Sequence, residues 1–177
     1  PCTLARCRPG PTSSSTSAEG SVFWVGTEGD DAAAGSRDEP WATIQHAADS
    51  VGPGATVLVL EGVYEQRLEL LTSGLPGRPI TFAAAPDERV VLDGSSLEVP
   101  AGQAAVIAID SQRYIRVQGF EITGYRSDVS GHVPVGILVT GASDHIRIAG
   151  NLVHDMGTTF EGRSGGDAHG IAVFGTT

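Results

Sequence analysis

Short apolar runs recur along this chain at intervals that lengthen from 23 to 34 residues. The runs of one series begin at Val57, Ile80, Ile107, Ile137 and Ile171. Those of a second series begin at Leu68, Val90, Ile115 and Ile146, and a third pair follows at Phe120 to Ile122 and Leu152 to Val153. Two or three short strands per repeat, each returning to the same face, are typical of a solenoid. The pattern therefore predicts an all-β parallel β-helix.

The length of the repeat separates bare coils from coils that carry a loop. Three strands of about 15 Å each, with three turns, close one coil in roughly 22 to 25 residues. The longer steps need loops that leave the coil at one corner, because otherwise the two series would lose register. The added residues lie in two Gly-rich, largely polar segments, 123–136 and 154–170. We expect these two loops to stack.

The expected strands alternate between core and surface residues. In 114–117 and 145–148, β-branched residues two positions apart face inward, while Arg116 and Arg147 between them face solvent. Glycine makes up 24 of 177 residues, about twice the usual share near 7%. A coil with many sharp corners accounts for this excess, because glycine tolerates positive φ.

One helix is expected, over residues 39–51. Ile44, Ala47, Ala48 and Val51 form a narrow apolar stripe, Pro40 suits a first-turn position, and residues 52–54 end the helix. The first coil of a solenoid has an uncovered apolar end. We therefore expect this helix, together with Trp41, to cap the N-terminal mouth of the coil.

The β-helix and its cap are expected to span residues 22–177, preceded by a disordered Ser/Thr/Pro-rich linker over 1–21. Cys2 and Cys7 are close enough for a disulfide, and a metal site there would need further ligands. The linker ahead of a solenoid suggests export. Ile171 begins a strand with no partner strands or cap after it, so we expect the coil to continue beyond Thr177, with some or all catalytic groups downstream.

Charge and hydropathy narrow the classes of partner. The net charge of −10 and the pI of about 4.7 argue against nucleic acid, which binds basic surfaces. The same acidic groups are suitable ligands for a divalent cation. No apolar run of about 18 residues is present, so no membrane span is expected.

Several segments resemble the opening of secreted right-handed parallel β-helix proteins of the pectate-lyase-like superfamily. The resemblance lies in segments 23–31, 39–45, 53–64, 73–74, 77–82 and 91–94, and so covers most of residues 22–125. This part of the chain is similar to pectate lyases whose coil begins with such a cap. The resemblance is specific for the fold. It does not specify the substrate, because the same opening precedes lyases, hydrolases, epimerases and proteins of other kinds.

The resemblance implies cleavage of an acidic polysaccharide by β-elimination. In that chemistry a cation, often Ca²⁺, neutralises the uronate carboxylate, and a basic side chain removes the C5 proton while the C4 oxygen leaves. The lyases that this chain resembles use Lys or Arg as the base. This sequence contains no lysine. The base is therefore Arg or His, or it lies beyond Thr177, or the chain is not a competent lyase.

The two loops carry the candidate site residues. The candidate catalytic side chains are Arg126, Arg163, His154 and His169. Uronate carboxylates would bind Arg126, Arg163 or His132, and Ca²⁺ would bind Asp128, Asp155, Glu161 or Asp167. Simpler roles stay open for all of them: Asn151 and Asp155 as turn formers, the other charged residues as solvated surface, and the histidines in packing.

Two other functions remain open. A carbohydrate-binding or cell-surface solenoid would bind sugars without chemistry, although three Tyr and two Trp leave few rings for stacking. A glycoside hydrolase would need two carboxylates about 5 to 9 Å apart, for which Asp155 and Asp167 are the candidates. An unsaturated product distinguishes a lyase from both.

Overall fold

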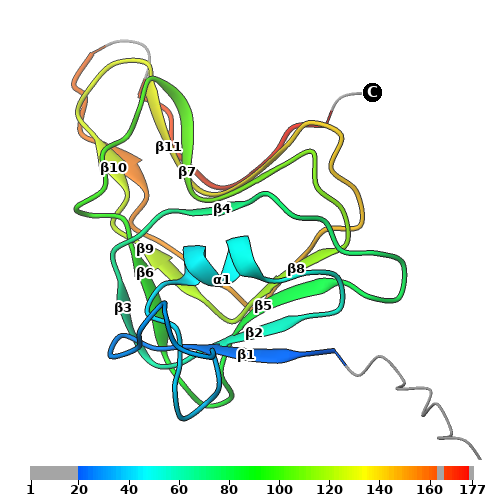
Figure 1. Cartoon of the computed structure of the whole chain (residues 1–177). Helices are drawn as coiled ribbons and strands as arrows, with labels where there is room; N and C mark the ends of the chain where they lie inside the picture. The colour runs from blue at the N-terminus through cyan, green and yellow to red at the C-terminus, as the bar shows by residue number, and fades with distance from the viewer. Residues whose placement is uncertain (1–19, 163–165, 176–177) are drawn as a thin grey trace, which may run out of the picture.

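The protein, described here from a computed structural model over residues 20–162 and 166–175, is a coil of short parallel strands. Three sheets form its walls (Figure 1). Sheet A contains β1 (Val22–Val25), β2 (Thr56–Val59), β5 (Ile80–Ala84), β8 (Ile115–Gln118) and β12 (Arg147–Ala149). Sheet B contains β3 (Gly62–Tyr64), β6 (Val90–Asp93), β9 (Glu121–Thr123) and β13 (Leu152–Val153). Sheet C contains β4 (Leu68–Leu70), β7 (Gly102–Asp110), β11 (His132–Thr140) and β15 (His169–Val173).

The core lies inside the coil, where one residue from each strand stacks on its counterpart in the next turn. Val57, Phe82 and Val117 form such a column in sheet A, because pairing places them in register. All three are buried. Full burial of a side chain of this size contributes about 1.5–3 kcal/mol. Repetition of such columns in sheets B and C accounts for the predicted apolar periodicity.

The order of the strands corrects the predicted series. Val57 and Ile80 belong to sheet A, but Ile107, Ile137 and Ile171 belong to sheet C. The second series likewise combines strands of all three sheets, whereas the third pair is in register within sheet B. The error has a simple cause. All three walls point β-branched residues inward, so hydropathy does not distinguish one wall from another.

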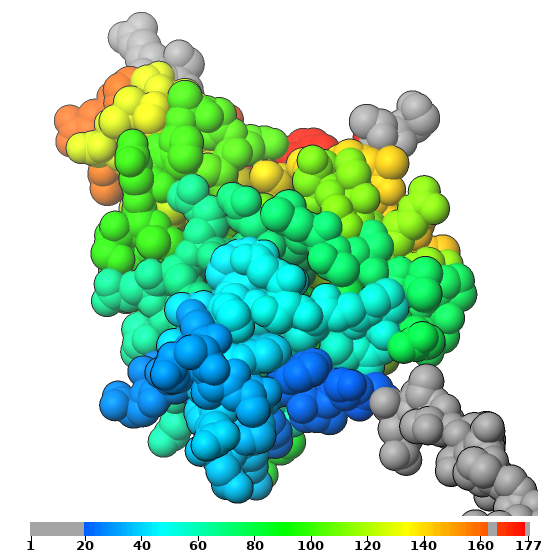
Figure 2. Space-filling view, in the orientation of Figure 1, coloured from blue at the N-terminus to red at the C-terminus, as the bar shows by residue number. Residues whose placement is uncertain are grey.

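The N-terminal mouth is covered by α1 (Ile44–Ser50), which lies across the near end of the coil in Figure 1. Figure 2 shows the N-terminal segments, blue to cyan, over this mouth. Ile44, Ala47 and Trp41 are buried in the main core, as the capping prediction requires. The helix begins later than expected. Thr43 is its N-cap and accepts from His46 N at 3.1 Å, so Pro40 lies outside the helix.

The two long loops leave the coil between sheets B and C, at one corner, as predicted. Each contains a short strand, β10 (Arg126–Ser127) in the first and β14 (Gly157–Thr158) in the second, and the two pair in parallel. The corner projects from the coil in Figure 1. No helix in residues 20–162 or 166–175 is long and apolar enough to cross a membrane. Both cysteines, and all but the last two residues of the linker expected over 1–21, lie outside the described residues.

Candidate functional site

Stacking of the two loops brings together side chains that are far apart in the sequence. Arg126 pairs with Gly157 in the β10–β14 ladder, so its side chain reaches the residues that follow β13. Its Nε donates to the carbonyl oxygen of Asp155 and its Nη2 to Asp155 Oδ1, both at 3.0 Å. Asp155 has a φ of 54°, a left-handed conformation that aspartate tolerates better than most residues. The predicted proximity of Arg126 and Asp155 is therefore present.

His154 lies between two carboxylates. Its Nδ1 is 2.7 Å from Asp155 Oδ2, and its Nε2 is 3.1 Å from Glu121 Oε1. These hydrogen bonds raise the pKa of His154, with the bond to Asp155 contributing most and the bond to Glu121 next. The protonated imidazolium donates from both nitrogens at once. While both bonds persist, His154 has no free nitrogen with which to accept a proton from a substrate.

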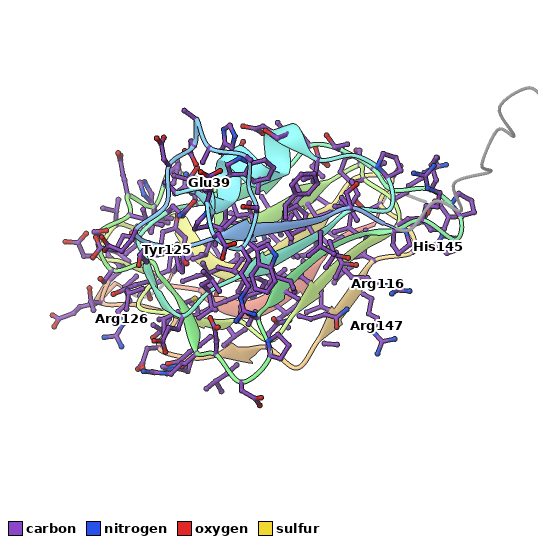
Figure 3. All side chains as sticks on the ribbon, turned by 60° about the horizontal axis from the view of Figure 1, so that its bottom comes forward. Glu39, Arg116, Tyr125, Arg126, His145 and Arg147 are labelled. Atoms are coloured by element: carbon purple, nitrogen blue, oxygen red, sulfur yellow. The ribbon has the colours of Figure 1, made fainter. Side chains whose placement is uncertain are left out.

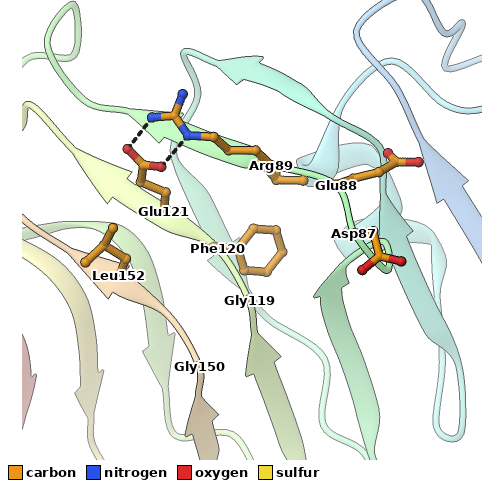
Figure 4. A pocket seen from close by; sticks show the side chains of 9 residues that line it. Asp87, Glu88, Arg89, Gly119, Phe120, Glu121, Gly150 and Leu152 are labelled. Carbon is orange, nitrogen blue, oxygen red and sulfur yellow. Dashed lines mark hydrogen bonds and ion pairs between the residues drawn. The ribbon is translucent and has the colours of Figure 1, made fainter.

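Glu121 on β9 continues this chain of ion pairs to the preceding turn. Arg89 donates from Nε to Oε2 and from Nη2 to Oε1, each at 2.7 Å (Figure 4). The Arg89 bonds, followed by the His154 bond, lower the pKa of Glu121 to about 2. The Glu121 side chain is 15% exposed, whereas that of Arg89 is 74% exposed. Glu121 is therefore ionised at neutral pH and does not act as a proton donor there.

We call Arg89, Glu121, Arg126, His154 and Asp155 the corner network. Sequence reasoning missed two of its members, Arg89 and Glu121. These two residues lie 32 positions apart, which is about the length of one of the later turns of the coil. Aligning the strands of sheet B in their correct register would have revealed this spacing. With His154 protonated, the network holds three cations and two anions, and the Arg89 and Arg126 ends are exposed. The corner network can therefore attract and orient an anion.

A shallow pocket adjoins the network where sheet A turns into sheet B. Its volume is about 340 Å³, within the usual range for small ligands. Phe120, Glu121, Arg89 and Leu152 contribute to its lining (Figure 4). Leu152, which is exposed, gives this pocket an apolar contact, and Arg89, Asp87 and Glu88 give it charged groups of both signs.

The remaining predicted residues lie outside the network. Nδ1 of His132, the first residue of β11, is 2.6 Å from the carbonyl oxygen of Val99, which lies 33 positions earlier in the chain. His169 begins β15, in register with Val135. Asp128, Glu161 and Asp167 are exposed. Arg163 lies outside the described residues. The catalytic, substrate-binding and metal-binding roles assigned to these six residues stay predictions.

The described carboxylates do not fit a calcium site. Both carboxylate oxygens of Asp155 already have cationic partners, Arg126 and His154. Across residues 20–162 and 166–175, no group of three or more His, Cys, Asp or Glu side chains is arranged to hold a metal ion. Calcium prefers six to eight oxygen ligands. For the chain as a whole, the calcium prediction stays a prediction.

Comparison with known proteins identifies related sequences. The family described as "Pel9A-like, right handed beta helix region" matches residues 23–174. The uncharacterized protein YwoF of Bacillus subtilis is 33% identical over 159 residues, which are 90% of this chain and 33% of that protein. Pectate lyase PEL9 of Emericella nidulans is 26% identical over 147 residues, 80% of this chain and 36% of that enzyme. The chain thus spans about a third of the length of these relatives.

Solved structures share the fold at lower sequence identity. A rhamnogalacturonan lyase superposes with a TM-score of 0.60 at 18% identity, over 75% of this chain and 36% of its own. A GH136 lacto-N-biosidase from Eubacterium ramulus superposes with a TM-score of 0.67 at 18% identity, over 88% of this chain and 30% of its own. At such identities the likeness concerns the fold alone.

Proposed function

Because the chain belongs to the Pel9A-like right-handed β-helix family, we propose that it is part of a polysaccharide lyase that cleaves an acidic, uronate-containing polymer by β-elimination. The observation that carries this proposal is that the chain is 26% identical to a pectate lyase across 80% of its length. Such a polymer is found outside cells, so we also propose that the protein is secreted.

The corner network suits a role in binding the uronate carboxylate. Arg126 is held by Asp155 through two donors, which leaves part of its guanidinium exposed to solvent. A guanidinium can hold a carboxylate through two parallel hydrogen bonds. Neutralising that carboxylate makes the C5 proton more acidic, which is what β-elimination requires. Arg126 is thus the proposed carboxylate-binding residue.

The base that removes the C5 proton is not assigned to a described residue. Nε and Nη2 of Arg126 both donate hydrogen bonds to Asp155, so neither nitrogen is free to take up a proton. His154 becomes a base only when it loses its proton and one of its two carboxylate contacts. The sequence offers no lysine. The proposal therefore assigns substrate binding to the corner and leaves proton abstraction open.

The test follows ultraviolet absorbance of the unsaturated product from polygalacturonate, rhamnogalacturonan and alginate, with Ca²⁺ and with chelator, beside a reducing-end assay. A lyase produces both signals. Reducing ends without absorbance would make the protein a hydrolase, and neither signal would make it a binding solenoid; both results contradict the proposal. Arg126→Ala should lower kcat/KM about tenfold or more. Arg37→Ala, which removes an exposed arginine that stacks on Trp24 and belongs to neither the corner network nor its pocket, is the control and should leave kcat/KM unchanged.

A further inference from the structure

We infer that the outer face of sheet A carries a second site, centred on Arg116 and Arg147, that binds the carboxylates of an acidic polysaccharide. Arg116 on β8 and Arg147 on β12 are in-register partners. Such partners lie about 4.8 Å apart in a parallel sheet. Both side chains are exposed, and Figure 3 shows them side by side on the outside of the coil. Arg126 of the corner network lies at the other side of this view.

These two arginines have no counter-charge among residues 20–162 and 166–175. Within the described residues, neither guanidinium forms a hydrogen bond, an ion pair or an aromatic contact, whereas every other described arginine has such a partner. Those partnered residues are Arg37, Arg67, Arg78, Arg89, Arg113 and Arg126. The contrast is large in a chain with 21 acidic and 11 basic residues. Like charges directly opposite on neighbouring strands destabilise a sheet. An external anion would relieve that repulsion.

The surrounding sheet is free of acidic side chains. None of the strands of sheet A, β1, β2, β5, β8 and β12, contains Asp or Glu. The row of Arg116 and Arg147 continues through Thr81 on β5 to Thr56 on β2, because pairing places these four residues in register. Two charges are thus followed by hydroxyl groups along one line across the strands. This order matches a polymer of hydroxyl-rich rings that carry single carboxylates.

A pocket with an aromatic wall lies beside the two arginines. Its volume is about 360 Å³, and Tyr114, His145 and Pro79 help to line it with Arg116 and Arg147. The rings of Tyr114 and His145 stack with centroids 4.4 Å apart, and their backbones have φ values of 54° and 53°. Aromatic rings are common surfaces for apolar faces of ligands that also carry polar groups. A sugar ring here would place its carboxylate against the guanidiniums.

Asp144, an acidic group that contacts this wall through His145, is already paired with a guanidinium. Asp144 Oδ2 is 3.1 Å from Arg113 Nε, and its Oδ1 is 2.8 Å from His145 Nδ1. Nucleic acid fits less well, because duplex DNA carries one charge per about 1.7 Å of its axis and would meet only two unpaired guanidiniums on a chain whose net charge is −10. The site therefore favours spaced carboxylates over closely spaced phosphates.

The experiment measures binding of a defined oligogalacturonate by isothermal titration calorimetry. Arg116→Ala and Arg147→Ala should each weaken binding about tenfold or more, and Arg147→Lys should keep the charge but lose part of the affinity, because lysine cannot bind bidentately. Arg78→Ala is the matched control: it removes the same charge from a side chain that donates to the Pro53 carbonyl, and it should leave affinity unchanged. Neither Arg116→Ala nor Arg147→Ala should lower the melting temperature, since no internal partner is lost.

Three results would overturn the inference. They are unchanged affinity in both alanine variants, equal binding of an uncharged oligosaccharide, or equal binding of a short single-stranded DNA. The inference shares only its substrate class with the proposed function. Arg147-dependent binding without an unsaturated product would leave the inference standing and remove the lyase, whereas an active lyase whose binding ignores Arg116 and Arg147 would do the reverse.

Discussion

His154 has an unusual position for a surface histidine, because each ring nitrogen meets a different carboxylate. Asp155 and Glu121 both favour the protonated ring, so they raise its pKa above the ordinary value of 6.5. Protonation in turn strengthens both hydrogen bonds. The residue therefore couples two turns of the coil through its charge.

This coupling predicts how His154 titrates. Followed by NMR through its ring protons, His154 should have a midpoint above 6.5. Asp155→Asn should lower that midpoint more than Glu121→Gln does, because the Asp155 hydrogen bond contributes most to the shift. Asp167→Asn, which changes an exposed carboxylate outside the network, should leave it in place. A midpoint at or below 6.5 in the unaltered protein would contradict the described geometry.

Only part of the corner network was predictable from sequence. Arg126 and Asp155 were placed together because both flank loops that leave the same corner. Glu121 and Arg89 were not, because Glu121 occupies an outward position on β9, Arg89 directly precedes β6, and both look like solvated surface. Their pairing becomes visible only when β6 and β9 are aligned, and the apolar series alone does not provide that alignment. Side-chain partners between turns depend on register, which hydropathy leaves undetermined.

At the scale of elements, a side chain of α1 covers the free edge of β4. Nε2 of Gln45 donates to the Glu69 carbonyl at 3.1 Å, and its Oε1 accepts from Glu69 N at 2.8 Å. One side-chain amide thus replaces the neighbouring strand that β4 lacks on this side. Unpaired strand edges invite pairing with other chains. The cap therefore satisfies main-chain groups as well as covering apolar ones.

Gln45→Ala should lower the free energy of unfolding by about 0.5 to 1.5 kcal/mol, because it removes two exposed hydrogen bonds to main-chain groups of Glu69. Urea denaturation measures the change. Glu69→Ala is the matched control: it keeps the main-chain donor and acceptor and should cost less. Equal stability of Gln45→Ala and the unaltered protein would show that water replaces the amide at no cost.

The start of α1 shows why element boundaries escaped the sequence. The expected start near Pro40 was reasonable, since proline suits a first helical turn. The side chain of Asp31 prevents this earlier start. Its Oδ1 accepts from Ala42 N at 2.8 Å and from Thr43 N at 2.9 Å, which holds these residues outside the helix. An aspartate 12 positions upstream gives no local sign of this role.

At the scale of the molecule, the coil, its cap and its shared loop corner were all predicted. Repetition makes this possible, because each turn buries the same kind of residue as the one before. The family match over residues 23–174 agrees with the segments that resembled pectate lyases. Substrate and chemistry are harder to infer. They depend on a few outward side chains, and repetition of the core places no constraint on them.

The corner network should also give the stability of the whole molecule a distinct pH dependence. Glu121 has a pKa of about 2 in the folded protein, below its ordinary 4.5, so its contribution is present above pH 4.5 and is lost as pH falls towards 2. His154 has a raised pKa, so its contribution is full below pH 6.5 and is lost as pH rises through the raised value. The two contributions overlap fully between pH 4.5 and 6.5.

The difference in unfolding free energy between the unaltered protein and Glu121→Gln should therefore be largest between pH 4.5 and 6.5. We expect roughly 1 kcal/mol there, because the Arg89 side of the ion pair is exposed and solvent screens it. Urea denaturation across the pH range measures the difference, and Glu69→Gln, at a side chain with no hydrogen bond in the described structure, controls for net charge. A difference that stays constant from pH 3 to pH 9 would mean that neither His154 nor Arg89 contributes through its bond to Glu121.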